Sequence, residues 1–129
     1  MSHPRFAPDM DVSPEFVGMS VNEYQAQSAT TAIYPGKGEW AGLAYTTLGL
    51  TGEAGEAAND VKKMARDDRT TRKPERIERL IDELGDCMWY MAQTCTELGI
   101  SLQTIMEMNR EKLKSRQERG VLRGDGSKR

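Results

Sequence analysis

The sequence predicts an all-α fold with four helices, and three observations support this. Apolar residues recur at spacings of three and four, helix start and stop signals flank those segments, and no stretch alternates as a half-buried strand does. A length of 129 residues with 37% hydrophobic residues fits one compact domain. We expect a flexible leader at residues 1–19, a helical domain at 20–120 and a basic flexible tail at 121–129.

The first helix is expected to follow Ser20, because Ser20 and Glu23 have the spacing of a capping box, and to end near Tyr34-Pro35. The second is expected to run from Trp40 to about Ala65. Its apolar and small residues form a continuous seam that we expect to be buried, namely Leu43, Thr47, Leu50, Ala54, Ala57, Val61 and Met64.

Three glycines lie within the second predicted helix, at Gly49, Gly52 and Gly55. Each lowers helix propensity by about 1 kcal/mol relative to alanine. Their presence indicates either close packing against another helix or room for a ligand, and the sequence favours neither.

The third helix is expected to begin at Pro74, which suits a first turn, and to stop at Gly99. Its apolar stripe consists of Ile77, Leu80, Ile81, Leu84, Cys87, Met88, Met91, Cys95 and Leu98. Ser101 can cap a fourth helix that ends near Gly120. We expect its inward residues to be Leu102, Ile105, Met106 and Leu113.

Composition and charge exclude several classes of protein. The formal net charge is −2, although residues 110–129 carry a net charge of +5, so the rest of the chain is acidic. An acidic domain with a basic C-terminal segment does not by itself indicate nucleic-acid binding. No apolar run reaches the roughly 20 residues of a membrane span, and no signal-peptide pattern opens the chain, so we expect a cytoplasmic protein. Cys87 and Cys95 lie about 12 Å apart on one predicted helix, which is too far for a disulfide. His3 is the only histidine, which argues against histidine-based metal sites.

Two acidic motifs carry the functional prediction. Glu53 and Glu56 lie three residues apart on the second helix, and Glu83 and Asp86 do so on the third. With about 100° per residue, both pairs lie on the same rotational side of their apolar seams, so antiparallel packing brings them to one side of the helix pair. The short connection between the helices requires that packing. Four carboxylate ligands are what Mg²⁺ or Mn²⁺ takes when it holds a polyphosphate.

These motifs resemble those of the MazG-like all-α nucleoside triphosphate pyrophosphohydrolases, a superfamily that includes dimeric dUTPases and dCTP pyrophosphatases. The matching segments are GLTGEAGE at Gly49–Glu56 and DELGDCMWY at Asp82–Tyr90. The resemblance spans about residues 20–120 and implies a four-helix MazG-like bundle completed by homo-oligomerisation, as a homodimer or homotetramer. It implies hydrolysis of a (deoxy)nucleoside triphosphate between the α- and β-phosphates, for nucleotide pool sanitation or control.

The resemblance also implies roles for individual residues. Glu53, Glu56, Glu83 and Asp86 would bind Mg²⁺, with Mn²⁺ as a possible substitute, and Glu53 or Glu56 would activate the attacking water. Lys62, Lys63, Asn109, Lys112 and Arg116 match the phosphate-contacting positions. Taken from the sequence alone, Asn109 is either a satisfied core amide or points at the site, and Lys112 and Arg116 are either a solvated flank or phosphate ligands. Gln25, Thr31, Tyr34 and Trp40 are either candidate contacts to the base or residues with an ordinary packing role.

Two other functions are compatible with a helical protein of this kind. A non-catalytic helical homodimer could use the acidic face to bind a basic partner. A di-iron carboxylate bundle is disfavoured, because such sites use Glu-x-x-His motifs and neither acidic motif has a histidine beside it.

Overall fold

The computed structural model describes residues 18–69 and 71–125, which form four helices and contain no strand. The helices are α1 (Val21–Ala29), α2 (Trp40–Asp67), α3 (Pro74–Glu97) and α4 (Leu102–Glu118). The all-α prediction is therefore confirmed. Most of the predicted leader, and the last residues of the predicted tail, lie outside the described residues.

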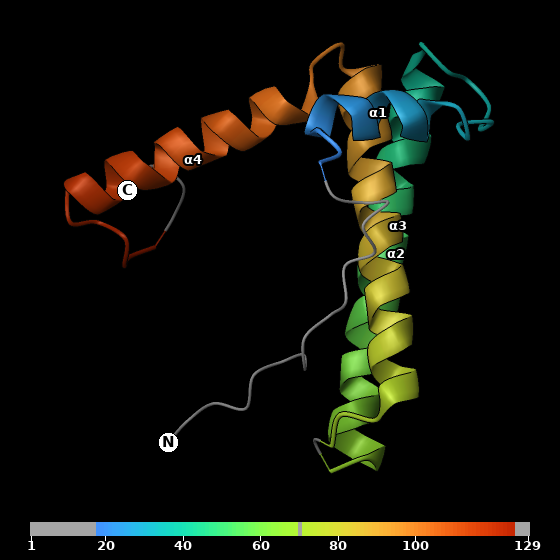
Figure 1. The fold of residues 1–129 in the computed structure, drawn as a ribbon, viewed down its shortest axis with the longest axis vertical. Helices are drawn as coiled ribbons and strands as arrows, with labels where there is room; N and C mark the ends of the chain where they lie inside the picture. Colours follow the sequence, from blue (N-terminus) through green and yellow to red (C-terminus); the bar gives the residue numbers. More distant parts are fainter. Residues whose placement is uncertain (1–17, 70, 126–129) are drawn as a thin grey trace.

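The long helices α2 and α3 form an antiparallel pair, which is the main packing unit of the chain (Figure 1). The short helix α1 lies across one end of this pair, and α4 extends away from it to the side (Figure 1). Within the described residues α4 contacts α1 and α3 but does not contact α2. A single chain therefore does not close into a four-helix bundle.

The predicted helix signals act where the sequence placed them, except at the end of α1. Ser20 and Glu23 form both hydrogen bonds of a capping box, and Ser101 accepts a hydrogen bond from the backbone N–H of Thr104. Gly99 follows α3 with φ of 68°, the left-handed conformation that favours glycine. α1 ends at Ala29, several residues earlier than expected, and the hydroxyl groups of Thr30 and Thr31 bond to backbone carbonyls of the preceding turn. Such local hydrogen bonds compete with helix continuation.

The face that α2 turns toward α3 differs from the predicted seam. The buried residues of α2 are Gly42, Thr46, Asp60 and Met64. Of the seam residues, Thr47, Ala54 and Val61 are exposed. Gly49 lacks a side chain, which lets α3 approach the α2 backbone closely there, and the ring of Tyr90 lies against it. Gly42 instead lies against the backbone of Gly36 in the loop before α2. The prediction of a buried seam through Ala54 and Val61 is therefore wrong for the single chain.

Ion pairs fix the connection between α2 and α3. The Asp68 side chain is almost fully buried and pairs with Lys73 at 2.9 Å and with the Nε of Arg76 at 2.7 Å. These partners hold the pKa of Asp68 below its usual value, through hydrogen bonds to Lys73 and Arg76. The contact ties the end of α2 to the first turn of α3 and so helps to set how the two helices align.

α1 and the following loop are attached to the far end of the pair. Ala92, Cys95 and Leu102 form a small buried cluster against which Val21 and Tyr24 pack. The carboxylate of Glu97 accepts hydrogen bonds from the Tyr34 hydroxyl at 2.5 Å and from the backbone N–H of Gly38 at 2.9 Å. These contacts hold the α1–α2 loop against the end of α3.

A broad apolar surface of the α2–α3 pair stays exposed. On α3 it consists of Ile81, Leu84, Met88 and Met91, and on α2 of Leu50, Ala54 and Val61, which are exposed or half-buried. Each set is rotated about 100° from the residues that join the two helices, in the same sense, so in an antiparallel pair both sets lie on one side. We call these residues the apolar face.

Cys87 and Cys95 are both buried and form no disulfide with each other, as expected. No described helix is long and apolar enough to cross a membrane.

Candidate metal centre

Three carboxylates meet near the middle of the α2–α3 pair. Each of Glu53, Glu83 and Asp86 offers an oxygen, and these oxygens all lie within 4.8 Å of one another. Glu53 and Glu83 are half-buried between the helices, whereas Asp86 is exposed. Glu56 lies one helical turn further along α2, is exposed and falls outside this group of three. Three of the four predicted carboxylates therefore meet, and the participation of Glu56 stays a prediction.

The cluster is electrostatically strained without a cation. A hydrogen bond with Glu53, followed by burial and by the charges of Glu53, Asp86 and Glu56, raises the pKa of Glu83. Burial, followed by the charges of Glu53, Glu83 and Asp86, raises the pKa of the Cys87 thiol. A divalent cation would remove this repulsion, and carboxylate oxygens are the ligands that Mg²⁺ and Mn²⁺ prefer.

The reason for convergence differs in part from the prediction. We expected the acidic residues beside the line of contact between the helices, but Glu53 and Glu83 lie in it. Glu53 continues the contact line of Thr46 and Gly49, and Glu83 continues that of Cys87 and Tyr90, at helical spacing. Antiparallel packing remains the feature that brings the pairs together.

Aromatic side chains adjoin the carboxylates, and the sequence analysis did not single out Tyr45 or Tyr90 for a role here. Burial, followed by Tyr45 and the charges of Glu53 and Asp86, raises the pKa of Tyr90. Tyr45 stacks on Tyr34 with ring centroids 5.3 Å apart, and Trp89 meets Tyr90 edge to face at 5.0 Å. The available signal was the position of Tyr90 four residues after Asp86, on the same side of the helix.

The comparisons with known proteins agree with this geometry. A family model described as the MazG nucleotide pyrophosphohydrolase domain matches residues 42–121, which include both acidic motifs. The chain belongs to the MazG family. The Gene 37 protein of Mycobacterium phage L5 is similar, with 47% identity over 114 residues that cover 86% of this chain and all of the phage protein. No solved structure matches the chain.

Two lysines on α2 of this MazG domain are predicted to contact the substrate phosphates, and Lys63 lies closer to the side of the carboxylates than Lys62 does. Lys63 lies two turns beyond Glu56 and, at about 100° per residue, on nearly the same side of α2. Lys62 is rotated by about 180° from Glu53, so its backbone position is on the far side of the helix. Helical rotation therefore favours Lys63 over Lys62, and phosphate contact by either lysine stays a prediction.

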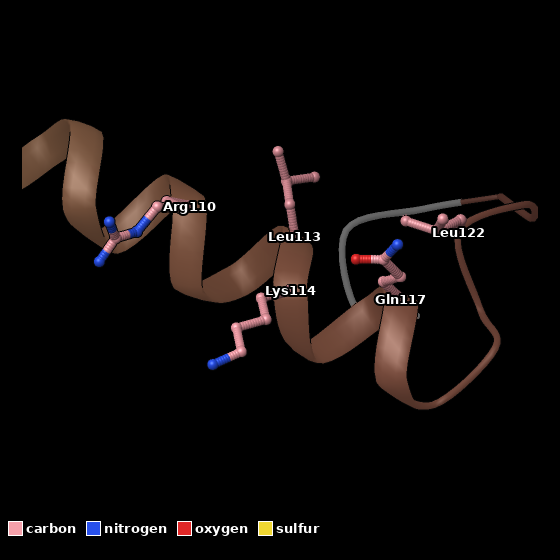
Figure 2. A pocket seen from close by; sticks show the side chains of 5 residues that line it. All are labelled: Arg110, Leu113, Lys114, Gln117 and Leu122. Atoms are coloured by element: carbon pink, nitrogen blue, oxygen red, sulfur yellow. The ribbon is translucent and has the colours of Figure 1, made fainter.

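The three residues predicted on α4 are not brought to the carboxylates within one chain. Asn109 and Lys112 are exposed and Arg116 is buried, all on the part of α4 that extends away from α2 and α3 (Figure 1). Because Asn109 is exposed, the alternative of a satisfied core amide does not hold for the single chain, and its contact with phosphate stays a prediction. An open hollow on this part of α4 is lined by other residues, namely Arg110, Leu113, Lys114, Gln117 and Leu122 (Figure 2).

Of the residues predicted to contact the base, some have hydrogen-bond partners within the chain and Trp40 is exposed. The Gln25 amide bonds to the Thr96 hydroxyl, the Ile100 carbonyl and the backbone N–H of Leu102, so it joins α1 to the start of α4. Thr31 accepts a hydrogen bond from the Trp89 indole at 2.8 Å. Trp40 is exposed at the first position of α2. Gln25 and Thr31 thus make packing contacts in the single chain, and contact with the base stays a prediction for all of these residues.

Proposed function

We propose that this MazG protein hydrolyses (deoxy)nucleoside triphosphates between the α- and β-phosphates, giving nucleoside monophosphate and pyrophosphate, with Mg²⁺ as cofactor. The observation that supports this most is the convergence of Glu53, Glu83 and Asp86 within 4.8 Å in a chain that matches the nucleotide pyrophosphohydrolase family. We place the protein in the cytoplasm, where these substrates are found.

The carboxylates suit a magnesium site. Glu53, Glu83 and Asp86 would hold the ion, with Glu56 one turn away to complete the ligand set, and Mn²⁺ is expected to substitute. The bound ion would supply charge neutralisation for the phosphates and would lower the pKa of a bound water. The raised pKa of Glu83 supports this assignment, because it shows a concentration of negative charge that a cation would relieve.

The reaction also needs a group that accepts the proton of the attacking water. Water attacks the α-phosphorus, the bond from this phosphorus to the oxygen bridging to the β-phosphate breaks, and pyrophosphate leaves with that oxygen. We assign the proton lost by the water to Glu53 or Glu56. A positioned general base of this kind contributes about 10²- to 10⁴-fold to the rate. Glu56 is the better placed of the two to exchange that proton with solvent, since it is exposed.

We further propose that the protein is a homo-oligomer joined through the apolar face. Ile81, Leu84, Met88 and Met91 repeat at spacings of three and four along α3, as residues of a helix–helix interface do. A second antiparallel pair packed on this face would complete a four-helix bundle. The carboxylates would stay open, because Glu56 and Asp86 are rotated to the opposite side of the pair.

A panel of (deoxy)nucleoside triphosphates tests the reaction and its specificity together. Purified protein with Mg²⁺ should release pyrophosphate and the matching monophosphate from at least one nucleotide, and chelation by EDTA should stop the release. If no nucleotide yields pyrophosphate at high protein concentration, the proposed reaction is wrong and the alternative of a non-catalytic interaction module gains support.

A further inference from the structure

An arginine outside the two acidic motifs lies beside the carboxylates. Arg79 precedes Glu83 by four residues on α3, so the two side chains are neighbours on one helix face. At about 100° per residue, Arg79 is rotated from Glu83 toward the side on which Asp86 lies. It is also one turn closer to the α2–α3 connection, at a rise of about 6 Å along the helix. This places a positive charge next to the cluster on its open side.

A buried aspartate holds Arg79 from the other helix. The Nε of Arg79 donates a hydrogen bond to Oδ1 of Asp60 at 3.3 Å. Asp60 lies on α2 one turn beyond Glu56, and it is only 7% exposed. A buried carboxylate requires a partner charge, and this one fixes the direction of the guanidinium while using only its Nε–H.

Arg76, one turn earlier, shows what a purely structural arginine looks like in this chain. Its side chain is 17% exposed and is bound by Asp68 at 2.7 Å and Asp67 at 3.8 Å, with Asp60 further off at 4.0 Å. Arg79 is instead 51% exposed. Within the described ranges, Asp60 is the only hydrogen-bond partner of Arg79. The terminal nitrogens of Arg79 are therefore available to a ligand.

We propose that Arg79, oriented by Asp60, binds the terminal phosphates of the substrate, which leave together as pyrophosphate. This inference rests on the proposed function. The reacting α-phosphate would lie at Glu53, Glu83 and Asp86. The β- and γ-phosphates of the substrate can then extend along α3 by about one helical turn, toward Arg79. The guanidinium fork suits two phosphate oxygens at once, and such charge-assisted pairs are among the stronger hydrogen bonds. Arg79 is the specific phosphate contact, and Asp60 is a positioning residue.

The competing explanation is that Arg79 and Asp60 form only an ion pair between helices. Ion pairs with an exposed partner contribute little to stability. That explanation predicts that an Arg79 variant binds substrate and pyrophosphate as the wild type does. The proposal predicts weaker binding of both ligands with little change in the melting temperature.

The test compares Arg79→Gln with Arg66→Gln. Arg66 is a matched control because it also pairs with an aspartate through its Nε, at 2.5 Å from Asp67, but lies further along α2 and is 65% exposed. We measure KM and kcat for a substrate found in the nucleotide panel, and the inhibition constant of pyrophosphate. Arg79→Gln should raise KM and the inhibition constant by about ten- to a hundredfold, as loss of a hydrogen bond to a charged group does. Arg66→Gln should leave both unchanged.

Two more variants separate position from charge. Arg79→Lys keeps the charge but loses the fork, so its inhibition constant for pyrophosphate should lie between those of the wild type and Arg79→Gln. Asp60→Asn should also weaken pyrophosphate binding, and combining it with Arg79→Gln should add little, since both changes disrupt one contact. Additive losses would show that Asp60 does not act through Arg79.

The outcomes of this test are distinct from those of the proposed function. If the wild type hydrolyses nucleotides and Arg79→Gln has wild-type constants, the inference is overturned while the reaction stands. If the wild type hydrolyses none, calorimetric titration with Mg²⁺ and pyrophosphate decides the inference alone. Binding by the wild type that Arg79→Gln loses would support it, and equal binding, or none by either protein, would overturn it. Circular dichroism melting of each variant shows that the fold is retained.

Discussion

Glu53 on α2 and Glu83 on α3 bring carboxylate oxygens within 4.8 Å of each other across the helix pair, and hydrogen bonding to Glu53 is the largest cause of the raised pKa of Glu83. Two carboxyl groups this close together are a poor arrangement for stability alone. The fold places them in the contact line between the helices, where an apolar pair would pack better. Their position is explained if a cation lies between them.

This relationship predicts opposite effects of one substitution with and without metal. In EDTA, Glu83→Gln should raise the melting temperature by a few degrees, because the ionised form of Glu83 is disfavoured in the folded protein. With Mg²⁺, the wild type should gain stability, by about 2.7 kcal/mol at a hundred times the dissociation constant, and the variant should gain much less. Thermal melts with and without Mg²⁺ measure both effects.

Glu78→Gln is the control for that experiment. Glu78 is exposed on α3 and is rotated by about 140° from Glu83, away from the cluster. The control should keep the wild-type response to Mg²⁺. If Glu83→Gln responds to Mg²⁺ as fully as the control, the carboxylate cluster is not the metal site.

Turnover should depend on the exposed members of the acidic motifs. Glu56→Gln and Asp86→Asn should each lower kcat/KM by at least about 10²-fold, because each removes a metal ligand or the group that accepts the proton. Release of pyrophosphate gives the rate, and helical circular dichroism should stay unchanged since both residues are exposed. Full activity in either variant would contradict the assignment of that residue.

Gly49 and Gly55 should respond in opposite ways to alanine. A Cβ at Gly49 would collide with the ring of Tyr90, whereas one at Gly55 would meet no described atom within 4 Å. Gly49→Ala should therefore be destabilising, by about 1–3 kcal/mol for overpacking less the propensity gained. Gly55→Ala should be stabilising by about 0.5–1 kcal/mol. Urea denaturation measures both, and equal effects would show that Tyr90 does not pack on Gly49.

Stability should depend on pH through Asp68. Its pKa is lowered in the folded protein, so its contribution is present above the pKa of about 3.9 in the unfolded chain and is lost as pH falls through the lower folded value. Asp68→Asn should lower the melting temperature at pH 7, and the difference from the wild type should shrink at strongly acid pH. A difference that does not change with pH would point to packing rather than ion pairing.

The apolar face predicts the effect of one charge on assembly. The wild type should have at least twice the chain mass of 14.5 kDa by light scattering. Leu84→Lys, which places a charge in the centre of the face, should reduce that mass. Leu48→Lys is the matched control, since Leu48 is also exposed but is rotated about 100° to the other side of the contact line. A monomeric wild type would contradict the proposed interface.

Much of this fold was predictable because its signals are local. Ser20, Ser101 and Gly99 mark helix ends by their own side-chain or backbone chemistry, which does not depend on tertiary contacts. The convergence of the acidic motifs was also predictable, because helical angles and a short connection constrain it. The buried face of α2 was not predictable, since Gly42, Thr46 and Asp60 are buried there and give no hydrophobic signal.

Other parts of the site could not be predicted for a different reason. The apolar stripe at Ala54 and Val61 predicts burial correctly only if a partner covers it. A single sequence does not distinguish burial within one chain from burial against a second chain. The placement of α4 depends on tertiary contacts near Leu102, so the sequence alone did not show that Asn109 and Lys112 lie away from the carboxylates. Arg79 was missed because an arginine on a helix surface is common.

The α2–α3 pair has a consequence for how the protein folds. All of the carboxylates lie on one helical hairpin, residues 40–97, whose two arms follow each other directly along the chain. Contacts of this local kind form early in folding, before α1 and α4 need to dock. We therefore expect that Mg²⁺ accelerates refolding as well as slowing unfolding, because its ligands are already assembled when the rate-limiting barrier is crossed.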